Sequence, residues 1–151
     1  MRNLPVAVLA AAAFLTGCGG VSDVTDEIGI TQVTIPNGTR INAETMRTDI
    51  ELLKGLMFRE SLPAGRGMLF IHPQEDIFHY WMYQTKIPLD IIWMDHDRRI
   101  VEMSLDTPPC RSQSARECTN YGGNFKSKYA LEVNAGVVKK NGLQAGDTLV
   151  F

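Results

Sequence analysis

The sequence lacks an excess of basic charge. Its 15 lysines and arginines face 17 acidic residues, which gives a formal net charge of −2 across 151 residues. Proteins that bind nucleic acid neutralise phosphates with clustered basic side chains, often with aromatic residues between them. Here the aromatic residues gather in the middle of the chain rather than among lysines. The composition therefore argues against nucleic acid as a partner.

Several sequence motifs of catalysis and cofactor binding are also missing. There is no Gly-x-Ser-x-Gly nucleophile turn, no phosphate-binding P-loop and no dinucleotide glycine fingerprint. We therefore expect no cofactor. Residue types that bind metals occur in two groups. The first contains His72, Glu75, Asp76 and His79, and the second is the run Asp95-His96-Asp97. Neither has a familiar zinc-ligand spacing, and the second is better explained as a hairpin turn, so no metal site is predicted.

No hydrophobic run is long enough to cross a bilayer, which takes about 20 apolar residues. The longest, from Leu4 to Leu15, follows Arg2 and ends in Gly17-Cys18. This pattern is typical of a bacterial lipoprotein signal and predicts removal of residues 1–17 and lipid on Cys18. The alternative is an ordinary secretory signal. The lipoprotein interpretation places the protein in the bacterial envelope with its domain in the periplasm, and the absence of aspartate at Gly19 slightly favours the outer membrane over the inner.

The rest of the chain divides into a tether and one domain. Residues 18–30 carry the predicted lipidated cysteine and a small, polar segment, and residues 31–151 form a single domain. With Cys18 assigned to lipid, Cys110 and Cys118 remain as a pair across a polar loop, which favours a structural disulfide in an exported protein. The alternative, a redox or metal-binding pair, lacks Cys-x-x-Cys spacing and a nearby histidine.

Short apolar segments separated by turns predict a mainly β fold, a compact β-sandwich or open barrel with one or two short helices. A capping-box sequence at Thr48-Asp49-Ile50-Glu51 starts the best helix, with Ile50, Leu53 and Met57 on one face. A second helical turn is expected over 137–141. The expected strands are 31–36, 39–43, 68–71, 77–82, 91–94, 100–105, 130–133 and 148–151.

Five motifs recur in a known order. They are Gly55-Leu56-Met57-Phe58-Arg59, Gly67-Met68-Leu69-Phe70, Trp81-Met82-x-x-Thr85-x-Ile87-Pro88-Leu89-Asp90, Leu131-Glu132-Val133-Asn134-Ala135-Gly136 and Gly146-Asp147. Together they resemble the bacterial and archaeal family called domain of unknown function 192, from residue 31 to the C-terminus. The resemblance implies a compact β-rich domain and supplies no activity. Gln84 departs from the family pattern, which usually has asparagine there, and this puts a turn cap or a ligand contact at that position in doubt.

Three charged residues stand inside these apolar motifs: Arg59, Asp90 and Glu132. An unpaired buried charge is costly, so each must reach solvent or find a partner. One hypothesis places them in a ligand pocket with Trp81, Met82 and Thr85. There Arg59 would grip an anionic or hydroxyl-rich ligand and Trp81 would offer a stacking face. The alternative is a structural pair between Arg59 and a carboxylate.

The sequence thus predicts a lipid-anchored envelope protein that acts as a small-ligand binding or accessory module. Its partners would be the membrane, through Cys18, and a small ligand or another envelope protein. An alternative is an envelope hydrolase in which Asp90 and Glu132 form the acid/base pair, and this requires the two carboxyl groups to lie about 5–10 Å apart. A third possibility is a structural or protein-interaction module with the Trp81 region as its partner surface.

Overall fold

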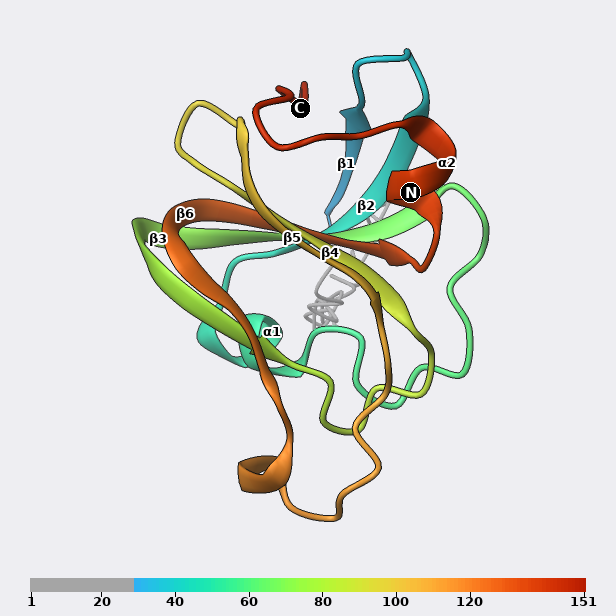
Figure 1. The fold of residues 1–151 in the computed structure, drawn as a ribbon, viewed down its shortest axis with the longest axis vertical. Helices are drawn as coiled ribbons and strands as arrows, with labels where there is room; N and C mark the ends of the chain where they lie inside the picture. Colours follow the sequence, from blue (N-terminus) through green and yellow to red (C-terminus); the bar gives the residue numbers. More distant parts are fainter. Residues whose placement is uncertain (1–28) are drawn as a thin grey trace, which may run out of the picture.

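A computed structural model describes residues 29–151 (Figure 1). The mainly β prediction with two short helices is confirmed. The strands are β1 (Ile30–Thr34), β2 (Arg40–Met46), β3 (Arg66–Trp81), β4 (Leu89–Met94), β5 (Ile100–Thr107) and β6 (Asn120–Asn134), and the helices are α1 (Asp49–Lys54), α2 (Val137–Asn141) and the 3-10 turn η1 (Ala115–Glu117). The predicted signal peptide, the predicted lipidation site at Cys18 and nearly all of the predicted tether lie outside the described residues.

The six strands form one sheet in the order β1-β2-β3-β6-β4-β5. Neighbours pair antiparallel except β2 and β3, which pair parallel. The expected strand 148–151 is instead a pair of isolated bridges, Arg99 with Thr148 and Thr34 with Val150. Because these bridges join the C-terminal segment to β1 and to the residue preceding β5, the segment spans from one edge strand to the other. It thereby closes one side of the bent sheet.

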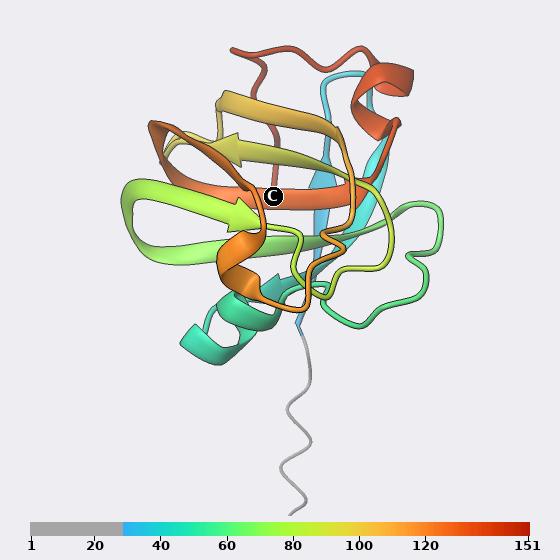
Figure 2. The same ribbon diagram turned by 60° about the horizontal axis from the view of Figure 1, so that its bottom comes forward.

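The sheet buries a core on each face. On the face that the C-terminal segment closes, which we call the closed side, the core includes Val33, Leu69, Ile92, Val133 and Leu149. On the opposite face, the cavity side, the core includes Met68, Phe70, Ile91, Trp93 and Ala130. Figure 2 shows α2 and α1 on opposite sides of the sheet, α2 with the C-terminal segment and α1 below.

The two longest strands bend together (Figure 1). The sequence suggested separate strands 68–71 and 77–82, but β3 is continuous, with register shifts between Ile71 and Asp76 and between Ile77 and His79 against β6. These irregularities turn β3 back, because bulges bend a strand. The ring of Phe78 consequently stacks on that of His72, with centroids 3.5 Å apart.

The sequence predicts only residues 130–133 of β6, and the unpredicted first half contains Gly122 and Gly123, a residue type that is depleted in strands. In the fold they are places of close ring packing. A Cβ at Gly122 would lie 2.5 Å from the Trp93 ring, and one at Gly123 would lie 2.0 Å from the His79 ring. The pairing with β3, rather than local preference, makes this segment a strand.

Helix α1 begins as expected, with the capping box of Thr48 and Glu51 formed in both directions. It does not bury the apolar face that the sequence outlines. Ile50 is 79% exposed and Leu53 63% exposed. Because of this exposure, α1 presents apolar side chains to solvent next to the cavity described below.

Within residues 29–151 no helix has the length and apolarity needed to cross a membrane.

The predicted Cys110–Cys118 disulfide is present. It closes the loop that contains η1, and the backbone N–H of Cys110 donates to the carbonyl of Met82 at 3.0 Å. Cys110 also packs against the cavity-side core. The disulfide thus fastens this loop beside the end of β3.

Candidate functional site

A cavity of about 200 Å³ opens on the cavity side of the sheet. An apolar cavity of about 150 Å³ can hold a benzene-sized molecule, so the space fits a small one-ring ligand. Its lining comes from α1 and the residues after it, from both arms of the bent β3, and from one residue each of β6 and the loop after β3. These are Leu52, Leu53, Lys54, Gly55, Leu56, Met57, Phe70, His72, Phe78, His79, Tyr80, Trp81, Thr85 and Glu132.

Gly55, which ends α1, packs directly over the cavity floor. Its φ of +44° belongs to a region that side chains other than glycine rarely adopt. A Cβ at this position would lie 3.0 Å from the ring of Phe70 and 3.8 Å from Glu132 Oε2. Glycine here lets the backbone approach both groups, so the first residue of the Gly-Leu-Met-Phe-Arg motif shapes the cavity.

Glu132 lies in the middle of the sheet, between Met68 of β3 and Ile91 of β4. The residue is 5% exposed. Within residues 29–151 neither a hydrogen-bond donor nor a charged partner stabilises its carboxylate, and burial alone raises the pKa of Glu132 from 4.5 to about 8. At pH 7 the carboxyl group is therefore mostly protonated, and its polar atoms face the cavity.

Two further polar side chains of the lining satisfy each other. His72 Nε2 and the Tyr80 hydroxyl lie 3.0 Å apart. Burial, with a smaller effect of Lys128, lowers the pKa of His72 to about 4, and burial, helped by the charge of Glu132, raises the pKa of Tyr80 well above its usual value. Both side chains are neutral at pH 7, and Glu132 remains a buried polar group of the cavity without a partner among residues 29–151.

Asp90 lies on the opposite face of the sheet from Glu132. In the register of β4 and β6, Asp90 pairs with Val133 on the closed side, while Ile91 pairs with Glu132 on the cavity side. Directly paired residues point to the same face and successive residues to opposite faces. The geometry therefore does not bring Asp90 and Glu132 together as the acid/base pair that the hydrolase alternative requires.

Asp90 has a structural role instead. Its Oδ1 accepts a hydrogen bond from the backbone N–H of Asp106, and its Oδ2 accepts one from that of Val138, both at 2.9 Å. The side chain is buried, and the residue is 1% exposed. It thereby joins the end of β5 and the start of α2 to β4.

Arg59 makes the structural pair that the sequence left as an alternative. Its two terminal nitrogens donate to the two oxygens of Glu44 at 2.7 and 2.5 Å, and Arg66 adds a contact at 3.9 Å. The hydrogen bond from Arg59 holds the pKa of Glu44 below its usual value. Arg59 lines a second hollow, of about 330 Å³, which shares Gly55 with the cavity that holds Glu132, but Arg59 does not line that cavity.

Of the remaining candidates, Trp81 and Thr85 line the cavity and Met82 does not. Trp81 is 37% exposed, so its ring reaches both cavity and solvent, whereas Met82 is buried in the cavity-side core. Gln84 adopts a left-handed backbone, with φ of +55°, and its carbonyl accepts a hydrogen bond from Phe58 N at 2.7 Å. Asparagine tolerates that conformation better than most residues, which gives the family preference a backbone explanation.

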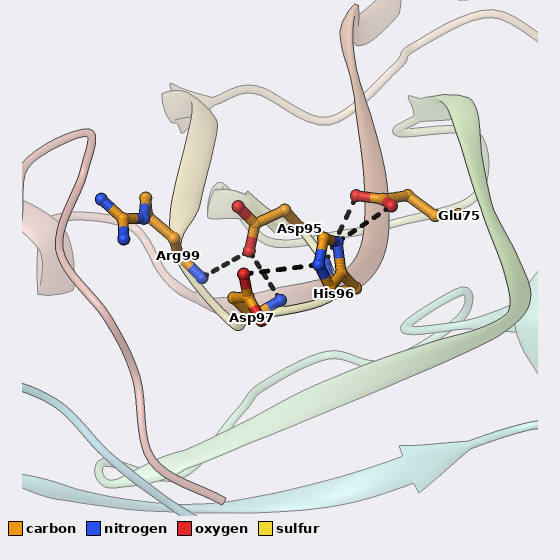
Figure 3. A network of polar contacts seen from close by, with 5 residues as sticks. All are labelled: Glu75, Asp95, His96, Asp97 and Arg99. Atoms are coloured by element: carbon orange, nitrogen blue, oxygen red, sulfur yellow. Dashed lines mark hydrogen bonds and ion pairs between the residues drawn. The ribbon is translucent and has the colours of Figure 1, made fainter.

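The two groups of metal-ligand residue types serve other purposes. Asp95 Oδ1 accepts hydrogen bonds from the N–H groups of Asp97 and Arg99 at 2.9 Å, which closes the turn between β4 and β5 (Figure 3). His96 of this turn contacts Glu75 of β3, with Nδ1 and Oε2 3.1 Å apart. Across residues 29–151 no group of three or more His, Cys, Asp or Glu side chains converges as a metal site would require.

Sequence reasoning missed most of the aromatic lining. Phe70 and His72 alternate on the first arm of β3, and Phe78 and Tyr80 alternate on the second. This period of two was visible, because alternate residues of a strand share a face. What could not be read was that β3 folds back, so that both pairs line the same space.

A model of the family DUF192, described as "Uncharacterized ACR", matches residues 31–151. The chain is similar to a protein of unknown function from Novosphingobium aromaticivorans, with 32% identity and a TM-score of 0.69 over 81% of this chain and 85% of that one. It is also similar to a putative transcription regulator from Sinorhizobium meliloti, with 26% identity and a TM-score of 0.68 over 79% and 89% of the two chains. None of the curated proteins matches the sequence.

Proposed function

The chain belongs to the DUF192 family, whose description gives no activity, and we propose from its own site that it is a small-ligand-binding module. The observation that carries the proposal is Glu132, a carboxyl group 5% exposed, without a partner among the described residues, in a cavity of ligand size. A buried polar group without a partner costs stability. Binding sites accept that cost when the group pairs with a ligand, because ligand pockets are mostly apolar with a few well-placed polar groups.

The geometry favours binding over hydrolysis. Asp90 is used by two backbone donors on the other face of the sheet, and among residues 29–151 no second carboxylate joins Glu132 in the cavity lining. Regulation of transcription by DNA contact is not proposed either. The described α-helices have six and five residues, and the net charge is negative.

We place this module in the bacterial envelope, held by lipid on Cys18, on the basis of the sequence pattern that ends at that residue. Expression of the full chain in bacteria tests this part. Labelled fatty acid is expected to enter the wild-type protein and the membrane fraction, and Cys18→Ser is expected to remove both the label and the membrane association. A Cys18→Ser protein that still fractionates with lipid label would overturn the anchor.

The binding function is tested by a thermal-shift screen of residues 21–151, a segment that contains every described strand and both cores. The library holds envelope sugars, peptidoglycan fragments, small anions, divalent metals and small amines and alcohols with one ring. A ligand of the cavity raises the melting temperature of the wild type and of Arg59→Ala, but not of Glu132→Gln. A different result would favour the interaction module. In that case no compound raises the melting temperature, and substitution of the exposed apolar residue Leu53 weakens binding to an envelope protein.

A further inference from the structure

The aromatic side chains of the cavity and the carboxyl group of Glu132, which has no partner among the described residues, together define a ligand chemistry. Rings of Phe70, Phe78, Tyr80 and Trp81 line the space, and Glu132 lies at its floor. The negative face of an aromatic ring attracts a cation, and a desolvated carboxylate binds an ammonium group through charge-assisted hydrogen bonds. Both features select for the same charge. We propose that the cavity binds small organic cations, with an ammonium group on the Glu132 carboxylate and an apolar body against these rings. This inference rests on the ligand-binding function proposed above.

Other ligand classes fit the lining less well. A carboxylate or phosphate would find only the single O–H of the protonated Glu132, and no positively charged side chain is buried in the described lining to balance its charge. A sugar needs a polar partner for most of its hydroxyl groups, and His72 and Tyr80 already bond each other. The cavity volume of about 200 Å³ limits the ligand to roughly one ring or a short alkyl chain.

The titratable groups around Glu132 allow such a cation to bind. Lys54, at the end of α1, is exposed to solvent, where water screens its charge. On β3, His72 and Tyr80 are neutral at pH 7, and the remaining titratable group of the lining is His79, which is exposed on the same strand. No cation is buried beside Glu132 within the described residues, so the ammonium group of a ligand would fill that place.

Binding must release a proton. In the free protein Glu132 holds its proton at pH 7, because burial raises its pKa to about 8. When an ammonium ion enters, the carboxyl group gives this proton to the buffer, and the resulting carboxylate accepts the N–H hydrogen bonds. We therefore expect the affinity for amines to rise up to about tenfold per pH unit between pH 6 and 8, since less work is then needed to ionise Glu132. A neutral ligand would show no such rise.

The experiment uses benzylamine, benzyl alcohol and benzoate, which share a ring and differ in charge. Titration calorimetry of residues 21–151 at pH 7, in two buffers of different ionisation enthalpy, counts the protons released. Benzylamine is expected to bind with release of about 0.9 proton, the fraction of Glu132 protonated one unit below its pKa. Benzyl alcohol and benzoate are expected to bind at least tenfold more weakly.

Three variants locate the binding. Glu132→Gln keeps the shape of the protonated acid and is expected to lose benzylamine affinity at least tenfold, together with proton release. Trp81→Leu replaces a partly exposed ring by another apolar side chain and is expected to lose affinity with proton release intact. Glu60→Gln, which changes an exposed carboxylate outside the cavity in the same way, is expected to bind benzylamine as the wild type does.

The outcomes separate the two proposals. If benzylamine fails to bind, or binds without releasing a proton, the cation proposal is wrong. If benzyl alcohol or benzoate then binds and Glu132→Gln weakens it, the cavity is still a ligand site and the proposed function stands. If none of the three binds and the wider thermal-shift library is also silent, both proposals fall.

Discussion

The two faces of the sheet differ in whether they supply hydrogen-bond donors to a buried carboxyl group. Asp90 on the closed side and Glu132 on the cavity side lie one register position apart in the β4–β6 pair. Each is at most 5% exposed. Asp90 accepts two backbone hydrogen bonds at 2.9 Å, whereas Glu132 accepts none from the residues described. Burial alone therefore does not tell the two acids apart, and the difference between them is whether the fold itself supplies the partner.

The difference follows from what covers each face. On the closed side, α2 and the C-terminal segment bring backbone N–H groups to the sheet, among them that of Val138. On the cavity side, α1 leaves Ile50 and Leu53 in solvent, and a space remains over Phe70. On the closed side the fold thus satisfies its own polar groups, whereas the cavity side keeps an open space beside an unpartnered carboxyl group. The following variants break or sharpen this comparison.

The largest effect is expected from Glu132→Gln when pH is varied. An acid whose folded pKa of about 8 exceeds its ordinary 4.5 stabilises the fold at low pH, and this stabilisation is lost as pH rises from 4.5 to 8. Between pH 4 and 9 the unfolding free energy of Glu132→Gln should therefore gain on the order of 4–5 kcal/mol relative to wild type. Urea unfolding of both proteins across this range measures it, and parallel curves would contradict the buried, unpartnered state of Glu132.

His72 also affects how the unfolding free energy of the wild-type protein depends on pH. His72 is neutral in the fold, with a pKa of about 4, so its contribution is lost as pH falls from 6.5 towards 4. This slope opposes that of Glu132 between pH 4.5 and 6.5. Wild-type stability is therefore expected to change little there and to fall by about 2 kcal/mol between pH 6.5 and 8. A rise in wild-type stability between pH 6.5 and 8 would mean that a group other than Glu132 governs the stability in this range.

The next largest effect is expected from Asp90→Asn. An amide can accept only one of the two backbone hydrogen bonds and leaves a buried N–H without a partner, so the unfolding free energy should fall by about 2–3 kcal/mol. In contrast to Glu132→Gln, the loss should be similar at pH 6 and pH 8, because Glu132 is still present in this variant. Ligand binding should persist. A variant as stable as the wild type would place Asp90 outside the structural network.

Arg59→Ala is expected to cost about 1–2 kcal/mol, because it leaves Glu44 with only the longer contact to Arg66. Amine affinity should not change, since Arg59 lines the second hollow rather than the cavity. Chemical unfolding and calorimetry on the same sample separate the two effects. A tenfold loss of affinity with unchanged stability would restore Arg59 as a ligand-binding residue.

The smallest effect on stability is expected from Leu53→Gln. The side chain is 63% exposed, so the unfolding free energy should change by no more than about 0.5 kcal/mol. Because Leu53 lines the cavity, ligand affinity should still fall. Val150→Gln, at an equally exposed position on the opposite side, is the matched control and should alter neither quantity. If the two variants bind the ligand with equal affinity, the exposed apolar side chain of Leu53 does not belong to the site.

The sequence was a good guide where structure is local. The capping box predicts the start of α1, the Asn37-Gly38 turn predicts the β1–β2 hairpin, and the paired cysteines predict the disulfide. Each of these depends on residues close together in the chain, whose preferences act without the rest of the fold.

It was a poor guide where structure depends on distant pairing. The glycines of β6 indicate a turn until β3 lies beside them, and the return of β3 arises from register shifts that no local pattern announces. The same applies to the site. Glu132, Trp81 and Thr85 were found because polar and aromatic residues in apolar motifs need explanation, but only the register shows that Asp90 faces away from Glu132.

The pairing of Thr34 with Val150 has a consequence for the order of events as the chain folds. Two backbone hydrogen bonds, at 2.8 and 2.9 Å, join residues separated by most of the domain. Until Val150 docks, β1 keeps a free edge of the kind that promotes aggregation. Leu149, which belongs to the closed-side core, docks in the same step. A partly folded chain therefore leaves this core open beside β1 until its C-terminal segment is in place.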